Sequence, residues 1–194
     1  KKKVEVIEFD MSDNSKIKKG CEIILSKFKT IDVLVNNAGI VKNSLFLMTS
    51  RSDLENLFQV NFFSQVYFTQ LIVKRMIKQK NFGNVIFLSS SSSKNADYGR
   101  FLYSCTKSSI LTLSKTLSKE LSNYNIRVNS ISPGLVDTKM TKDFISKNIL
   151  DLEIKKTLSK RMADPKEISS VILFLASSKS SYINGANISV DSGL

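Results

Sequence analysis

Hydrophobic residues along this chain alternate between short continuous runs and longer stretches with helical spacing. Apolar-rich runs of strand length occur at residues 4–9, 31–35, 84–88, 126–131 and 187–190. We expect the run at 31–35 to be buried on both faces of a sheet. Between the runs, apolar residues recur every three or four positions, which predicts amphipathic helices. Strands and helices in strict alternation indicate an α/β protein with a doubly wound parallel sheet.

The sequence predicts the extent of two helices and the starts of two others. The longest helix covers residues 52–79 and is apolar around more of its girth than packing on one face requires, which predicts a second packing partner. Another helix is predicted for residues 103–121. Residues 11–15 supply caps for the first helix, and Asp164-Pro165 is a typical helix start with proline at the first helical position.

Polar clusters follow four of the predicted elements directly. They are Asp10, residues 36–39, residues 89–93 and residues 132–138. In parallel sheets, ligands bind beyond the carboxyl ends of the strands. The four clusters therefore predict one site at one edge of one sheet.

Tyr103 and Lys107 supply proton-transfer chemistry in a chain that contains no histidine. If both lie on a helix, Lys107 is one turn after Tyr103 on the same face, where its ammonium can stabilise the phenolate. Ser90 follows a strand and can hold a substrate oxygen beside the phenol, with Ser89 and Ser91 as rivals. The absence of histidine excludes Ser-His-Asp and Cys-His catalysis and any ordinary zinc site.

Composition narrows the possible partners and the cellular location of the protein. The net charge of +12 comes from lysines scattered over the whole chain, without a nucleic-acid motif, so solvated surface is favoured over an anionic partner. Two cysteines are too few for a disulfide framework. No apolar run is long enough to span a bilayer. We expect a single cytoplasmic domain over residues 1–194, without nucleic-acid or membrane partners.

The motifs, taken in order, resemble those of the short-chain dehydrogenase/reductases, most closely the 3-oxoacyl-(acyl-carrier-protein) reductase-like branch. The resemblance runs along essentially the whole chain. Its motifs are Asp10-Met11, Asn36-Asn37-Ala38-Gly39, Asn61, Ser90, Tyr103-x-x-x-Lys107, Arg127-Val128-Asn129, Ser132-Pro133-Gly134-Leu135-Val136-Asp137-Thr138, Ser181-Tyr182-Ile183-Asn184-Gly185 and Val190-Asp191-Ser192-Gly193.

This resemblance implies a Rossmann-like oxidoreductase that uses NAD or NADP to interconvert a carbonyl and a secondary alcohol. Tyr103 would be the general acid or base, and Lys107 would hold the nicotinamide ribose and depress the pKa of Tyr103. Ser90 would orient the substrate oxygen. Asn61 would anchor a water that connects Lys107 to solvent. On spacing alone, Asn61 is as readily a packing or capping polar group.

The resemblance also implies a set of cofactor contacts besides Tyr103 and Lys107. Asp10 and Met11 would flank the adenine, although Asp10 also suits a helix cap. The remaining contacts would line the adenosine side of the cleft or close over the nicotinamide: Asn37, Ala38, Gly39, Pro133, Gly134, Val136 and Thr138.

The chain departs from the family pattern at its start. The family's first strand-helix-strand unit, with its glycine-rich phosphate turn, is absent from this sequence; such a unit with its following helix takes about 50 residues. In the family's strand order 3-2-1-4-5-6-7, two strands would lie between residues 4–9 and 31–35. We expect the native protein to contain this unit.

Other departures concern the substrate. Lys94, Arg100 and the lysines of a substrate lid at residues 138–162 suit an anionic or sugar-nucleotide substrate, as an alternative to a 3-oxoacyl thioester. A non-catalytic scaffold on the same fold is the competing function of another class. If the family habit holds, helices 52–79 and 103–121 form the contact of a homodimer or homotetramer.

Overall fold

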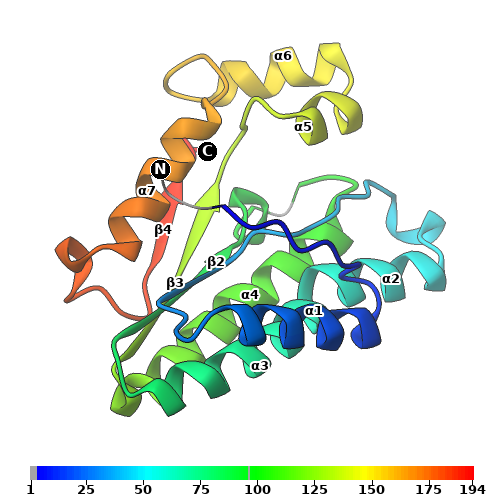
Figure 1. Ribbon diagram of the computed structural model, residues 1–194. Helices are drawn as coiled ribbons and strands as arrows, with labels where there is room; N and C mark the ends of the chain where they lie inside the picture. The colour runs from blue at the N-terminus through cyan, green and yellow to red at the C-terminus, as the bar shows by residue number, and fades with distance from the viewer. Residues whose placement is uncertain (1–3, 96) are drawn as a thin grey trace.

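The computed structural model describes residues 4–95 and 97–194, and these contain a four-stranded parallel sheet (Figure 1). Neighbouring strands pair in chain order, so each connection crosses one face of the sheet. The strands are β1 (Val33–Asn36), β2 (Gly83–Leu88), β3 (Ile126–Pro133) and β4 (Asn187–Val190).

Helices cover both faces of the sheet. Figure 1 shows α1 (Asn14–Lys27), α3 (Ser64–Gln79) and α4 (Phe101–Glu120) together on one side, and α7 (Pro165–Ala176) on the other. This arrangement confirms the predicted doubly wound α/β fold. No helix in the described part of the chain is long and apolar enough to cross a membrane.

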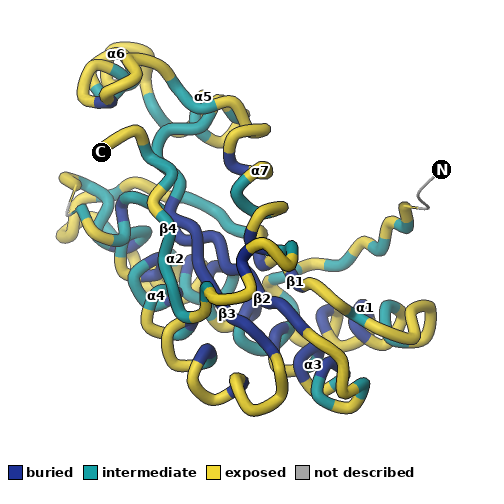
Figure 2. Tube along the Cα trace, turned by 90° about the vertical axis from the view of Figure 1, so that its left-hand side faces the viewer, coloured by how far each residue is buried: buried dark blue, intermediate teal, exposed yellow. Residues whose placement is uncertain are grey.

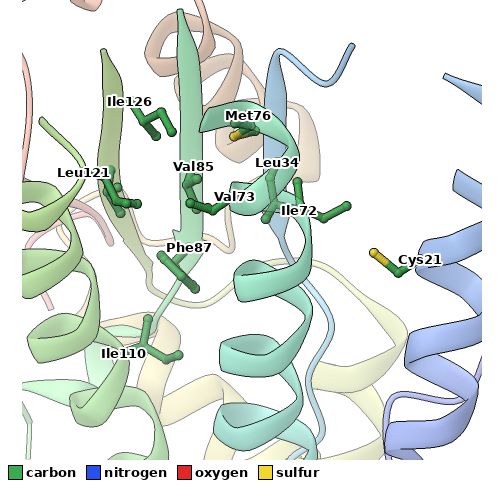
Figure 3. Close-up of a cluster of buried hydrophobic side chains, with 11 residues drawn as sticks. Cys21, Leu34, Ile72, Val73, Met76, Val85, Phe87, Ile110, Leu121 and Ile126 are labelled. Atoms are coloured by element: carbon green, nitrogen blue, oxygen red, sulfur yellow. The ribbon is translucent and has the colours of Figure 1, made fainter. Parts of the chain in front are cut away.

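Strand β2 divides the core into two halves. Val85 and Phe87 belong to the cluster shared with α3 and α4, and Figure 3 shows Phe87 beside Ile110 of α4. Ile86 and Leu88 belong to a second cluster formed with α7. Successive side chains of a strand point to opposite faces, so a strand covered on both sides must be apolar throughout.

The first predicted strand does not form. Residues 4–9 have no strand structure, and no described strand lies beside them to accept or donate ladder hydrogen bonds. For the same reason β1 is an edge strand: Val33 and Val35 are each 37% exposed, while Leu34 and Asn36 are buried. The prediction of a strand buried on both faces at residues 31–35 is therefore wrong for one face.

Helix starts follow the predicted capping chemistry. Asp13 caps α1 through the backbone N–H groups of Ser15 and Lys16. Asp164 and Glu167 form a reciprocal capping box at the start of α7, with Pro165 at the first helical position.

The long helix predicted at 52–79 is interrupted. Helix α2 (Arg51–Phe58) and α3 are joined by a π-helical turn over Gln59–Phe63. A π turn inserts one extra residue and often marks a functional position. Here it contains Asn61, which is completely buried.

Helices α5 (Lys139–Phe144) and α6 (Lys147–Lys156) follow β3 and stand apart from the helical layers. Figure 2 shows them as largely exposed, in contrast to the dark core strands. They lie within the predicted lid, residues 138–162.

Arg127 of β3 fastens α7 and the segment after it to the sheet. Its guanidinium donates to the carbonyl oxygens of Leu175 (2.8 Å), Ile183 (2.9 Å) and Ser177 (3.3 Å), and it lies 5.1 Å from the centre of the Phe82 ring. The last carbonyls of a helix have no partner within the helix. Arg127 therefore adds a charged donor to carbonyl oxygens that also accept from Asn84, Asn129 and Ser180.

Replacing Arg127 by Met should destabilise the protein by about 2–4 kcal/mol, because three hydrogen bonds from a charged donor are lost inside the fold. Urea unfolding at neutral pH measures this change. Arg51→Met is the matched control, since Arg51 is an exposed residue paired with Glu55, and it should change stability by no more than about 0.5 kcal/mol. Equal losses in the two variants would contradict the anchoring role.

Candidate active site

A cavity of about 840 Å³ lies at the carboxyl ends of the strands. The segments after β1, β2 and β3 line it, together with the first turns of α4, part of α7 and the two helices of the predicted lid. The polar clusters after β1, β2 and β3 thus meet in one place, as their positions at strand ends predict.

Tyr103 lies in the first turn of α4 and lines this cavity. Burial raises the pKa of its phenol, while a hydrogen bond with Ser90 and the positive charge of Arg100 act in the opposite direction. Ser90 follows β2, and its hydroxyl also accepts from the backbone N–H of Ser92 (3.2 Å). Strand β2 and helix α4 therefore bring two hydroxyl groups together.

Lys107 lies one helical turn after Tyr103. Its ammonium nitrogen is 5.8 Å from the centre of the Tyr103 ring and donates to the carbonyl oxygen of Leu88 (2.8 Å). The residue is only 4% exposed, and burial lowers the pKa of its side chain to about 8. The predicted same-face arrangement of the pair is present.

Ser89 and Ser90 make different contacts in the structure. Ser89 donates its hydroxyl to the carbonyl oxygen of Lys107 (2.8 Å), which ties the end of β2 to α4. Ser90 instead lies beside Tyr103, whose pKa its hydroxyl lowers, and both line the cavity. Ser91 also lines the cavity.

Asn61 uses its amide to hold the segment after β1. Its oxygen accepts from the backbone N–H of Ile40 (2.8 Å), and its nitrogen donates to the Ile40 carbonyl (2.9 Å) and to the Thr106 hydroxyl (3.1 Å). Both amide hydrogens are thereby occupied. Asn61 is not among the residues that line the cavity but lies behind them.

The predicted cofactor contacts fall into two groups. Asp10, Met11 and Ala38 do not line the cavity: Asp10 accepts from the Ser12 backbone N–H and hydroxyl, which lower its pKa, and the Ala38 carbonyl accepts from Gln65 (2.7 Å). Their cofactor roles stay predictions. The others line it: Asn37, Gly39, Pro133, Gly134, Val136 and Thr138.

Two observations fit a dinucleotide in this cavity. A Cβ atom at Gly39 would lie 3.5 Å from the Lys107 nitrogen, so the missing side chain keeps the space in front of the ammonium open. An ammonium has three donors, and among the described residues Lys107 has one acceptor, Leu88. Two donors remain for the vicinal hydroxyl groups of a ribose.

Several supporting contacts were not predicted from the sequence. Gln65 and Thr106 hold Ala38 and Asn61 in place, and the π-helical turn brings Asn61 inward. Gln65 lies four residues after Asn61 and Thr106 three after Tyr103, so helical spacing was the available signal.

Comparisons with known proteins agree with this geometry. The sequence model of the family described as enoyl-(acyl carrier protein) reductase matches residues 1–194. The 3-oxoacyl-[acyl-carrier-protein] reductase FabG of Thermotoga maritima is 36% identical over 192 residues, covering 99% of this chain and 77% of that protein. FabG of Chlamydia muridarum is 37% identical with the same coverage.

A solved structure gives the same fold. A proposed gluconate dehydrogenase from Agrobacterium tumefaciens superposes with a TM-score of 0.92 at 29% identity, covering 97% of this chain and 75% of that one. The chain belongs to the short-chain dehydrogenase/reductase family and is an oxidoreductase that uses NAD or NADP to interconvert an alcohol and a carbonyl.

Proposed function

We propose that Tyr103 is the general acid and base of this enzyme, that Ser90 orients the substrate oxygen and that Lys107 holds the cofactor ribose. The observation that carries this proposal is the convergence of Ser90 and Lys107 on Tyr103 within one cavity. A non-catalytic scaffold would have no need for this buried arrangement, because a lysine at this depth is unfavourable for folding.

The nicotinamide cofactor supplies the hydride when it is bound. In reduction, the substrate oxygen gains negative charge as the carbonyl carbon is reduced, and the Tyr103 phenol donates its proton to that oxygen. The raised pKa of Tyr103 keeps the phenol protonated near neutrality, which suits proton donation. Ser90 donates a second hydrogen bond and so fixes the oxygen beside the phenol.

Lys107 acts on the resulting phenolate. The sequence predicts that it depresses the pKa of Tyr103, whereas in the structure burial outweighs every favourable contact and the pKa is raised. The Lys107 ammonium is itself buried and bonded to Leu88. The ammonium therefore stabilises the phenolate that exists after proton transfer, until the phenolate is reprotonated.

Asn61 is proposed to connect Lys107 to solvent through a water molecule. Since both of its amide hydrogens are used by Ile40 and Thr106, the water would bond the remaining lone pair of the side-chain oxygen or the backbone carbonyl in the π turn. The fixed amide then serves as a positioning group for the segment after β1.

Two substrate classes are proposed. The FabG relatives favour a 3-oxoacyl thioester. A small polar oxo acid is the second candidate, because charged residues line part of the cavity and the similar solved structure is a proposed gluconate dehydrogenase. In both cases residues 138–162 act as the lid, since Met140, Thr141 and Phe144 of α5 and Lys156 of α6 face the cavity.

A homodimer or homotetramer through helices 52–79 and 103–121 is also part of the proposal. Phe63 is exposed within a group of aromatic side chains that includes Phe58 and Phe62, and Cys105 is exposed on α4. An apolar surface of this kind is typical of subunit contacts.

Replacing Tyr103 by Phe should lower turnover by at least about 100-fold while leaving cofactor binding intact, because the hydroxyl that donates the proton is removed and the ring is kept. Steady-state reduction of acetoacetyl thioesters and a cofactor titration measure the two effects. Tyr182→Phe is the matched control, since Tyr182 is fully exposed and outside the cavity. Turnover equal to that of the control would eliminate the proposed mechanism.

Replacing Lys107 by Met should change how stability depends on pH. The folded pKa of Lys107 is about 8, against an ordinary value of 10.5, so between these values the unfolded chain binds more protons at this residue. Lys107 therefore destabilises the fold most below its folded pKa, by about 3 kcal/mol, and this penalty disappears as the pH rises toward its unfolded pKa.

Urea unfolding of wild type and Lys107→Met from about pH 7 to about pH 9.5 tests this sign, because the difference between the two curves isolates Lys107. The stability of the wild type relative to the variant should increase across the range. A difference that is constant with pH would show that Lys107 is not a buried, charge-penalised amine.

A further inference from the structure

One wall of the active-site cavity is charged. Asp97 and Arg100 contribute to it from the segment before α4, and Glu153 and Lys156 contribute from α6 of the lid. Lys156 and Glu153 are paired with each other at 2.6 Å. Arg100 and Asp97 form a looser ion pair, with 4.0 Å between the guanidinium nitrogen and the carboxylate oxygen.

Arg100 has hydrogen-bonding capacity that the protein does not use. A guanidinium carries five N–H donors. Within residues 4–95 and 97–194, its side-chain acceptors are the Ser92 hydroxyl at 3.3 Å and the distant Asp97 carboxylate. Its side chain is 24% exposed, so it is partly shielded from water yet open to the cavity. The Asp97 contact is a weak, half-exposed ion pair that a ligand can replace at little cost.

The position of Arg100 relates it to the reacting centre. It precedes Tyr103 by three residues, and its charge is close enough to lower the pKa of the phenol against the effect of burial. Because Arg100, Tyr103 and Ser90 line the same cavity, a substrate whose oxygen meets Tyr103 and Ser90 can extend toward the guanidinium.

The other cations near the site do not share this position. Lys94 does not line the cavity; its nitrogen points to the Ser189 hydroxyl at 3.3 Å. Lys156 is the lid lysine that lines the cavity, and Glu153 already neutralises it. The expectation that Lys94, Arg100 and the lid lysines suit an anionic substrate thus narrows to Arg100.

We propose that Arg100 is a specificity-determining residue that binds a carboxylate of the substrate, close to the carbonyl that Tyr103 protonates. The substrate class is then a small oxo acid and the corresponding hydroxy acid. A planar guanidinium matches a carboxylate with two parallel, charge-assisted hydrogen bonds, and such bonds are about twice as strong as bonds between two neutral groups. This inference rests on the proposed role of Tyr103 and decides between the two substrate classes named above.

Acetoacetate and methyl acetoacetate test the proposal, because they share the same ketone and differ in the carboxylate. In the intact protein, Arg100→Gln should lower kcat/KM for acetoacetate by about 10- to 100-fold relative to the ester. Arg100→Lys, which keeps the charge but loses the two-pronged geometry, should fall between Gln and wild type. Arg51→Gln, the same change at an exposed site on α2, should leave the ratio as in wild type.

Parallel losses on both ketones, or a wild-type preference for the ester, would overturn the role of Arg100 and leave the Tyr103 mechanism standing. An NMR titration with acetoacetate separates the two proposals further. If wild type binds acetoacetate more tightly than Arg100→Gln does, the role of Arg100 in binding stands even without turnover of this ketone. If wild type neither turns over nor binds acetoacetate, the role of Arg100 falls, and the acetoacetyl thioester assay decides the Tyr103 mechanism separately.

Discussion

The active site depends on the way α4 is fastened to the end of β2. The Lys107 ammonium donates to the carbonyl oxygen of Leu88, and the Ser89 hydroxyl donates to the carbonyl oxygen of Lys107. These two bonds, formed in a water-poor interior, fix the helix against the strand in both position and rotation. As a result, Ser90 comes off the strand directly beside Tyr103 of the helix.

Burial sets the proton chemistry of this pair. It raises the pKa of Tyr103 and lowers that of Lys107 to about 8, so both shifts favour the neutral side chain. The pKa of Tyr103 therefore lies above that of Lys107, which favours proton transfer from the Lys107 ammonium to the phenolate over transfer in the opposite direction. Asn61, placed by a π-helical turn, keeps the neighbouring segment after β1 closed over this region.

The cavity combines the hydroxyl and ammonium groups around Tyr103 with a charged wall. Gly39 and the segment after β3 line the part of the cavity proposed for the cofactor, while Arg100 and Asp97 give the proposed substrate side a polar character. With the proposed roles, Tyr103 supplies the reaction and Arg100 the choice of substrate from the same helix start, one turn apart.

The sequence by itself determined the alternation of strands and helices, the capping residues and the order of the motifs, because these follow from local periodicity and short-range hydrogen bonding. It also placed Tyr103 and Lys107 on one helical face. The tertiary structure decided what long-range contacts control: the exposed edge of β1, the π turn at Asn61, the choice of Ser90 over Ser89, and the separation of Arg100 from Lys94. Each of these depends on which groups meet across the fold, and spacing along the chain carries no information about such meetings.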